Sequence, residues 1–489
     1  MRRTYFIYCL IATIALLLFG CKPDPIPMQH YYHDGLLVEG IEVAWYHRNG
    51  SCDDDADVVQ SFVNPFQFQG GKYTVMGCSW DSEPAYGIRC FDTETGKIKW
   101  EARLLQNVSP SSPQTGDYYR FRVVKNNDDY AYFARRKFSF TSDSFTEFWK
   151  VDLSNGNIVW CVEDSVEWNQ GNYAIRMVDD DYLYYSKCKE ADGHVANIWR
   201  MRTSDGVSEQ FYSEPAVPPY NQYKMYTAPF VYNGKQYHFL YKQDLIGGTE
   251  GNMRFNYKLM LLDGSTKQVL WTWNDPSHHH RSENIIDEVD VYNGNVILFF
   301  EKSCSVFDME QMQFAREIQI LPPLDTNAYK KERPRYEMEY IDHIFYKDYM
   351  IVRTDMWTDN PVENYPPSSW GYKPRSFQII DVNTGRFVDQ IPQSYYGSDG
   401  GYYADYAGHP FMGHLQEVDG IIYYSNDGHI QAYDLNQLKR LMAINHASRE
   451  GFASPCYKTS KGDVHFLVEG AHGNGGVYCF KSPFSNHKR

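Results

Sequence analysis

The chain has 489 residues, a formal net charge of −15 and 16% aromatic residues, with 41 Tyr, 28 Phe and 11 Trp. The acidic balance repels phosphate backbones and argues against nucleic-acid binding. Aromatic side chains pack well on the pleated surface of a sheet. Because sustained helical periodicity is absent after the N-terminal segment, the composition and pattern together favour an all-β protein.

Residues 1–20 have the pattern of a secretory signal peptide. Arg2 and Arg3 precede an apolar run over 5–19, and Gly20 comes directly before Cys21. This apolar run is shorter than the about 20 residues that a membrane-spanning helix needs. A charged start, a short apolar run and a small residue before the cleavage point are typical of export signals.

The end of this leader, Leu-Phe-Gly-Cys, resembles the lipobox of bacterial lipoproteins. The resemblance implies that Cys21 carries a lipid as the first mature residue. It also implies a lipid-anchored protein in the cell envelope of a Gram-negative organism, with the outer membrane as the expected location and the lipid as the only membrane contact. Ordinary secretion with an incidental cysteine is the alternative. Residues 21–35, which begin with the proline-rich stretch 22–27, are expected to form an extended tether.

A short hairpin motif recurs along the rest of the chain. Its clearest copy is 90–100, in which Asp92, Gly96 and Trp100 follow one another at a fixed interval, and 150–160 keeps the same pattern. The Asp can accept hydrogen bonds from the turn's own N–H groups, and the Gly supplies the positive φ where the chain reverses. Partial copies lie at 200–206, 261–271, 306–308, 379–389, 432–434 and 478–481. Eight copies predict eight repeats of one supersecondary unit.

The spacing of the copies fits four-stranded blades, some with inserted loops. We expect residues 36–484 to form one domain, an eight-bladed β-propeller of four-stranded antiparallel blades. Blade 1 is expected over 58–104 and the last blade over 452–481, where the chain runs out before a full outer strand. The segment 37–46, rich in alternating apolar residues, is expected to supply that strand, which closes the ring and removes an exposed sheet edge. The blades between them are expected over 119–164, 173–213, 228–274, 286–321, 336–392 and 412–446.

The Asp-x-x-Thr-Gly-x-x-x-Trp pattern of 92–100 resembles the repeat of the pyrroloquinoline-quinone-like (PQQ-like) β-propellers, which commonly have eight blades. The wider family includes scaffolds as well as enzymes, among them a lipoprotein of the outer-membrane protein assembly machinery. Its quinone-dependent dehydrogenases bind their cofactor beside a disulfide between adjacent cysteines. No two cysteines are adjacent in this sequence, so we expect no cofactor.

One cysteine pair is a candidate disulfide. Cys78 and Cys90 lie at equal distances from the centre of a strand–loop–strand unit around Pro84. They could therefore face each other across two strands, and an exported protein can form such a bond.

Loop lengths distinguish the two faces of the expected disc. Links between the first and second strands, and between the third and fourth, are short throughout. The long segments fall between second and third strands or between blades, at 105–117, 214–227, 244–256, 275–283, 322–334, 356–375 and 393–410. In repeat folds, insertions gathered on one face usually mark the binding face. Simple tolerance of insertions is the alternative.

Aromatic and histidine side chains in two of these segments are the candidate ligand-binding residues. They are Trp357, Tyr365, Trp370, Tyr372, Tyr402, Tyr403 and His409. Flat rings with a polar tip suit both sugar faces and protein interfaces. Packing against one another to order the loops is the alternative role.

Signals for catalysis or metal binding are weak. The run 278–280 of three histidines is more typical of a solvated loop than of a metal site, and no Gly-x-Ser-x-Gly or His-Glu-x-x-His motif occurs. We therefore expect no catalytic residues, no metal, and a binding or scaffolding lipoprotein whose partner is an envelope protein or a glycan. The alternative is a carbohydrate-active enzyme, a lyase or hydrolase with its carboxylates on the same face. The oligomeric state is not indicated.

Overall fold

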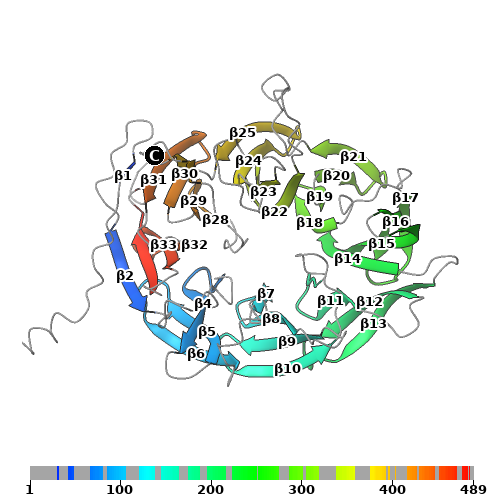
Figure 1. Ribbon diagram of the computed structural model, residues 1–489, viewed down its shortest axis with the longest axis horizontal. Helices are drawn as coiled ribbons and strands as arrows, with labels where there is room; N and C mark the ends of the chain where they lie inside the picture. Colours follow the sequence, from blue (N-terminus) through cyan, green and yellow to red (C-terminus); the bar gives the residue numbers. More distant parts are fainter. Residues whose placement is uncertain are drawn as a thin grey trace, which may run out of the picture.

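In seven blades, the hairpin repeat forms the third and fourth strands of a small antiparallel sheet. Eight such sheets stand around a common axis, as Figure 1 shows for the computed structural model. The predicted fold class, an all-β eight-bladed propeller, is confirmed. No helix occurs among the residues that the structure describes. These are 30–31, 42–48, 66–80, 85–105, 121–137, 145–164, 175–187, 195–215, 223–249, 252–274, 286–300, 304–318, 337–357, 375–392, 395–396, 402–403, 416–426, 429–445, 451–470, 476–482 and 484.

From the axis outward, the strands of each blade follow one another in chain order, apart from the N-terminal strands at the outer edges of blades 7 and 8. Blades 1 to 4 contain β3 (Phe66–Phe68), β4 (Tyr73–Trp80), β5 (Ala85–Asp92) and β6 (Ile98–Leu105); β7 (Phe121–Asn126), β8 (Tyr130–Lys137), β9 (Phe145–Asp152) and β10 (Ile158–Asp164); β11 (Tyr182–Ser186), β12 (Val195–Arg202) and β13 (Ser208–Pro215); and β14 (Tyr223–Tyr232), β15 (Lys235–Thr249), β16 (Asn252–Asp263) and β17 (Val269–Asn274).

Blades 5 to 8 continue the same order. They contain β18 (Ile286–Tyr292), β19 (Asn295–Phe300), β20 (Cys304–Asp308) and β21 (Gln313–Ile318); β22 (Glu337–Tyr346), β23 (Tyr349–Trp357), β24 (Arg375–Asp381) and β25 (Arg386–Pro392); β28 (Gln416–Val418), β29 (Ile421–Asn426), β30 (His429–Asp434) and β31 (Lys439–Asn445); and β32 (Gly451–Lys458), β33 (Val464–Gly470) and β34 (Gly476–Lys481). A separate two-stranded sheet is formed by β26 (Tyr395–Tyr396) and β27 (Tyr402–Tyr403).

Blade 3 departs from the four-stranded pattern on its inner side. Its sheet contains β11, β12 and β13, and a single bridge between Arg176 and Tyr184 stands where the other blades have a full inner strand. Among the described residues, the channel-facing edge of this blade is therefore a single bridge.

The ring is closed by the N-terminal strand β2 (Glu42–Arg48), which pairs antiparallel with β34 and gives blade 8 its outer strand. The closing strand also contacts blade 1. The Trp45 ring stacks on Phe91 with centroids 5.8 Å apart, and its indole N–H donates to the Thr93 carbonyl at 3.0 Å. The two ends of the chain are thereby joined in one sheet, which removes an exposed edge.

A second N-terminal strand, β1 (His30–Tyr31), pairs with β31 as a fifth strand on the outer edge of blade 7. This strand lies within the segment 21–35 that was expected to be an extended tether, so the paired part of the chain begins earlier than predicted. The expected signal peptide over 1–20 and the lipidation site Cys21 lie outside the described residues.

The recurring Asp, Gly and Trp residues dock blade 1 onto blade 2, and the Trp160 indole N–H makes the corresponding bond to the Thr203 carbonyl of blade 3. The indole N–H of Trp100 in blade 1 donates to the Leu153 carbonyl in the turn of blade 2 at 2.8 Å. The turn residue Gly156 has a φ of +78°, and a Cβ built there would lie 2.5 Å from the Trp100 ring. Asp152 closes the same turn by accepting the Ser154 backbone N–H at 2.8 Å. Glycine is thus required both by the backbone angle and by the ring that covers it.

Replacing Gly156 by Ala should destabilise the protein more than the same change at Gly234. Both glycines have positive φ, 78° and 75°, so alanine at either site costs about 1–2 kcal/mol in backbone strain. Nothing lies within 4 Å of a Cβ at Gly234, whereas the Trp100 ring must move at Gly156, which adds about 1–3 kcal/mol. Thermal unfolding of the two variants tests this. Equal shifts in unfolding temperature would show that the Trp100 ring accommodates a methyl group at position 156.

Apolar clusters fill the spaces between neighbouring blades. One cluster joins Ile88, Cys90 and Trp100 of blade 1 to Phe133 and Val151 of blade 2, and all five side chains are buried. Similar clusters join each further pair of neighbours from blades 2 and 3 to blades 6 and 7, and also join blade 8 to blade 1. Hydrophobic burial between sheets, rather than within one sheet, therefore holds the ring together.

The expected disulfide between Cys78 and Cys90 is wrong. In the register of β4 and β5, Cys78 lies opposite Gly87 and Cys90 lies opposite Val75. The two cysteines are thus three positions apart along the sheet, about 10 Å, whereas bridged cysteines have Cα atoms about 4.4–6.8 Å apart. Because side chains alternate between faces, the odd offset also turns the two thiols to opposite sides of the blade.

Candidate functional site

The two faces of the disc differ in how the strands are joined. We call the face with the links between first and second strands, and between third and fourth strands, the short-turn face. Its turns include 69–72, 127–129, 153–157, 233–234, 264–268, 293–294, 347–348 and 435–438. We call the other face, where the remaining links and the connections between blades lie, the long-link face. Its longer links include 106–120, 275–285, 319–336, 358–374 and 393–415, so the predicted difference between the faces is present in the strand bounds.

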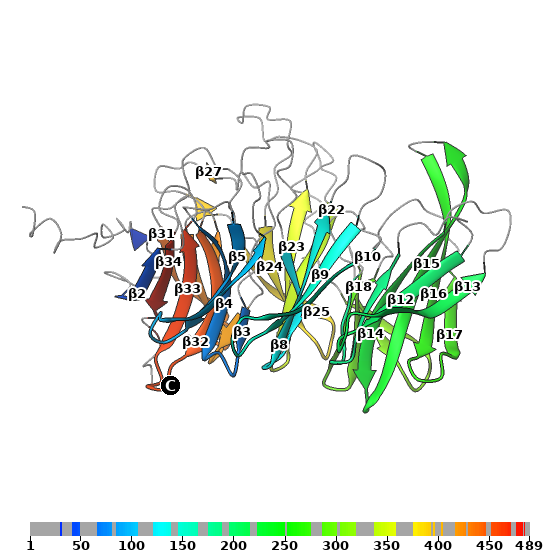
Figure 2. The same cartoon turned by 90° about the horizontal axis from the view of Figure 1, so that it is seen from below.

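One predicted loop is instead a pair of strands. The segment 244–256, expected to be a long insertion, continues the pairing of β15 with β16 as far as Thr249 and Asn252. The neighbouring strands stop earlier, since the last pair of β14 with β15 is Tyr223 with Asp244. The result is a two-stranded hairpin that rises above the disc on the long-link face, at the upper right of Figure 2.

The aromatic candidates cannot be assembled into a site from the described residues. Trp357 is the last residue of β23, and Tyr402 and Tyr403 form β27, which pairs with β26. Their backbones place them on the long-link side, but their side chains lie outside the described part of the chain. The remaining candidates, Tyr365, Trp370, Tyr372 and His409, lie outside it altogether.

Ion pairs join blades 3 and 4 beneath the projecting hairpin. Glu214, near the long-link end of β13, lies 3.0 Å from the Lys242 ammonium and 2.7 Å from that of Lys258. Burial raises the pKa of Glu214, but the hydrogen bonds from the two lysines outweigh it, so the net pKa is below the ordinary value. The two lysines face each other across β15 and β16, and the carboxylate between them offsets their repulsion.

A polar cluster between blades 2 and 3 lies at the same end of the strands. The Tyr185 hydroxyl donates to Asp164 at 2.5 Å, and the Lys187 ammonium lies 2.9 Å from the same carboxylate. Burial, and then the charge of Asp164, raise the pKa of the Tyr185 phenol. The phenol therefore stays protonated and serves as a hydrogen-bond donor that fixes the blade interface.

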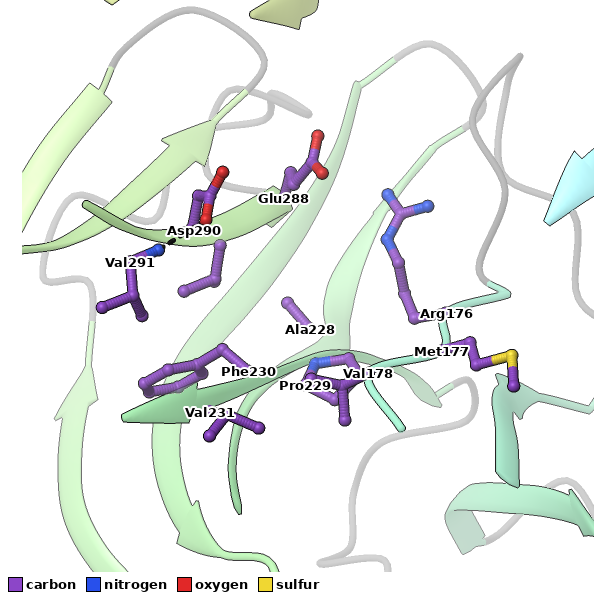
Figure 3. A pocket seen from close by; sticks show the side chains of 11 residues that line it. Arg176, Met177, Val178, Ala228, Pro229, Phe230, Val231, Glu288, Asp290 and Val291 are labelled. Carbon is purple, nitrogen blue, oxygen red and sulfur yellow. Dashed lines mark hydrogen bonds between the residues drawn. The ribbon is translucent and has the colours of Figure 1, made fainter. Parts of the chain in front are cut away.

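The described residues also line a pocket of about 340 Å³ on the channel side of blades 3, 4 and 5. Figure 3 shows its apolar floor, which includes Ala228, Pro229 and Phe230 of β14. Arg176 of blade 3 and Glu288 of β18 reach to the same side of this floor. The pocket lies toward the short-turn ends of these strands, on the side away from the long links. Sequence reasoning missed it because its residues come from three blades and form no local motif.

His343 of blade 6 supports the acidic side of this pocket. Its imidazole is 3.1 Å from the Asp290 carboxylate and stacks on Phe299 with centroids 3.9 Å apart. Asp290 also accepts the backbone N–H of Val291 at 2.6 Å. With two carboxylates on β18 and one guanidinium opposite, the pocket can bind a small polar ligand that carries a cationic group. Among the described residues, no group of His, Cys, Asp and Glu could hold a metal ion.

A second histidine, His238, is fully buried between blades 3 and 4. Its Nδ1 is 3.0 Å from the Thr227 hydroxyl and its Nε2 is 3.0 Å from the Gln236 amide, which also donates to the Tyr184 hydroxyl at 2.9 Å. Burial, and then the charge of Arg200, lower the pKa of His238 to about 3. The imidazole is thus neutral at every physiological pH, and its role is to connect two blades.

Acid should destabilise the protein through His238. The unfolded chain binds a proton at this residue near pH 6.5, while the folded chain does not until about pH 3. Stability is therefore lost as the pH falls below 6.5, by about 2 kcal/mol between pH 7 and pH 5 from this residue alone. Urea unfolding of the wild type and of His238→Gln at both pH values measures it. The same pH dependence in both proteins would contradict the assignment.

Comparisons with known proteins agree with this architecture. A structure of quinohemoprotein alcohol dehydrogenase from Comamonas testosteroni is similar with a TM-score of 0.50 and 12% identity, over 92% of this chain and 77% of that one. The chain has a PQQ-like propeller fold. A chain from a study of two prolyl endopeptidases is also similar, with a TM-score of 0.40 and 12% identity, over 88% of this chain and 54% of that one. No protein-family profile and no curated protein matches the sequence.

Such distant likeness assigns the fold and not an activity. The quinone of the PQQ-type dehydrogenases is an aromatic polycarboxylate. In the described pocket, Glu288 and Asp290 present two carboxylates against the single guanidinium of Arg176. Like charges repel, so the pocket does not fit that cofactor.

The described residues contain no helix that is long and apolar enough to cross a membrane.

Proposed function

We propose that this protein is an envelope-anchored, non-catalytic binding or scaffolding lipoprotein. It docks an envelope protein or a glycan on the long-link face, and a lipid on Cys21 holds it at the membrane. The observation that carries the proposal is the gathering of the longest links on one face of the disc. Loops on a rigid scaffold are where binding residues most often lie.

The short-turn face is less suited to binding because its turns are engaged in holding the ring together. Asp92 accepts the Thr95 N–H at 2.9 Å, and Asp263 accepts the Thr266 N–H at 2.7 Å. The Trp45 ring covers Gly96 in the Asp92 turn, and the Trp100 ring covers Gly156 in the corresponding turn of blade 2. Substitutions of these turn aspartates or of the covered glycines would disturb blade docking, whereas the long links can vary without that cost.

Replacing the link 358–374 by a short Gly-Ser linker is expected to abolish partner recovery. The lipidated, tagged chain would be purified from gently solubilised envelopes, with co-purifying proteins identified by mass spectrometry. As the matched control, Ser265→Ala changes an exposed residue on the short-turn face of the same disc and should retain the partner. Unchanged thermal unfolding would show that both variants fold. Recovery of the wild-type chain alone, or a partner retained without the link, would contradict a protein-docking role.

A glycan partner is distinguished by a second measurement on the same variants. Polysaccharide binding that is lost in Trp357→Ala and Trp370→Ala would identify the ligand as a glycan. Release of new reducing ends or unsaturated sugars from such a polysaccharide would overturn the non-catalytic part of the proposal and favour a carbohydrate-active enzyme.

A further inference from the structure

The direction of β1 indicates the side from which the N-terminal segment reaches the disc. His30 pairs with Ile444, next to the end of β31, and Figure 1 shows the two strands side by side. β31 begins after the turn 435–438 on the short-turn face and ends on the long-link face. Because β1 is antiparallel to β31, the chain enters β1 from the long-link face and runs toward the short-turn face.

The segment between Cys21 and β1 is too short to allow every orientation of the disc relative to the membrane. Fully extended, residues 21–29 span at most about 30 Å. Prolines at 23, 25 and 27 favour an extended, semi-rigid chain that does not readily double back. β31 is itself about 24 Å long. If the short-turn face pointed toward the bilayer, the segment would have to run back along blade 7 from the long-link face. That path would use most of its length.

We infer that the disc is held with its long-link face toward the bilayer, and that the partner of this face is a membrane-embedded protein. The inference rests on the proposed lipidation of Cys21. It holds for either side of the membrane, since only the order of lipid, tether and long-link face matters.

The projecting hairpin occupies the space between this face and the membrane. Beyond Asp244, β15 and β16 stay paired as far as Thr249 and Asn252, which extends them by about 15 Å. Figure 2 shows the hairpin and β27 on the same side of the disc. It is therefore the first described element to meet anything at the membrane surface.

The size of this space argues for a membrane-embedded partner over a soluble one. The anchor keeps the face within about 30 Å of the bilayer, which is roughly the diameter of a small domain. The hairpin already fills part of that gap. A soluble domain would have to displace it, whereas a protein embedded in the bilayer would meet the hairpin at the membrane surface.

Two positions on blade 4 offer a matched pair of probes for the orientation. Thr249 is at the tip of β15 on the long-link face, and Ser265 lies in the turn after β16 on the short-turn face. The length of β16 separates them by about 40 Å. A genetically encoded fluorescent amino acid at either position, in the full lipidated chain on phosphatidylethanolamine–phosphatidylglycerol vesicles, would report contact with nitroxide-labelled lipid headgroups.

We expect headgroup quenching to be severalfold stronger for the probe at 249 than for the probe at 265. Equal quenching would mean an edge-on disc, and stronger quenching at 265 a reversed disc; either would overturn the orientation. If mass spectrometry still finds the acyl group on Cys21 in that case, the proposed anchor survives. Loss of the acyl group would overturn the anchor and the orientation together.

The partner is tested in cells with a photo-cross-linking amino acid at the same two positions. We expect an adduct from position 249 that stays in the membrane after alkaline carbonate washing and needs detergent for extraction, and none from position 265. An adduct released by the wash would identify a soluble or peripheral partner and overturn this part of the inference. Adducts with lipid alone would overturn it as well.

Discussion

A chain that begins at residue 49, and so lacks β2, is expected to lose cooperative folding and to aggregate. β2 is the outer strand of blade 8, and its loss exposes the edge of β34 together with the buried side chains of Cys479 and Phe480. It also removes Trp45 from its place on Phe91 and Thr93. Domains are stable by only about 5–15 kcal/mol, so the loss of a whole strand with its docking contacts is not tolerated. Size-exclusion chromatography and thermal unfolding measure the outcome.

The matched control is a chain that begins at residue 32, which lacks β1 but keeps β2. Because β1 adds only two residues to an already complete blade 7, this chain should remain monomeric and unfold near the temperature of one that begins at residue 22. A chain without β2 that stays monomeric with an unchanged unfolding temperature would show that ring closure is not needed for stability.

Replacing Trp100 by Ala is expected to cost about 3–5 kcal/mol of unfolding free energy. The side chain is only 8% exposed, packs in the cluster between blades 1 and 2, and covers Gly156. The substitution leaves a cavity between blades and removes the donor to the Leu153 carbonyl. A lowered midpoint in urea, with the slope unchanged, is the expected observation.

Two further variants separate the contributions of this tryptophan. Trp100→Phe keeps much of the ring but loses the indole N–H, so it should cost about 1–2 kcal/mol for the hydrogen bond alone. Val207→Ala changes a side chain on the same disc that is 52% exposed and should have little effect. If Trp100→Ala shifts the midpoint no more than Val207→Ala does, the tryptophan is not a docking residue.

The features that could be read from the sequence are those with a local physical cause. Asp92, Gly96 and Trp100 recur because one side chain must satisfy the turn, one backbone must take a positive φ, and one ring must reach the next blade. Alternation of apolar residues marks strands because successive side chains face opposite sides. These rules act within about ten residues, so the repeat count, the propeller and the closing strand could be predicted.

The predictions that failed concern features set by strand register or by pairing between distant residues. Cys78 and Cys90 were expected to meet, but a shift of one position in an antiparallel pair changes the face that a side chain occupies. Residues 244–256 were expected to be a loop, and the glycines there do not prevent β15 and β16 from staying paired. Blade 3 was expected to have four strands like the other blades, and in the described part of the chain its innermost strand is one bridge.

The sequence by itself determined the number of blades, the docking turns and the difference between the two faces, because each depends on spacing along the chain. Only the tertiary structure decided that Arg176, Glu288 and Asp290 line one pocket and that His343 contacts Asp290. It also decided that β1 pairs with β31 and thereby brings the N-terminal segment in from the long-link face. Both arrangements join residues that are far apart in the chain, and contacts of that kind are selected by packing and leave no local pattern to read.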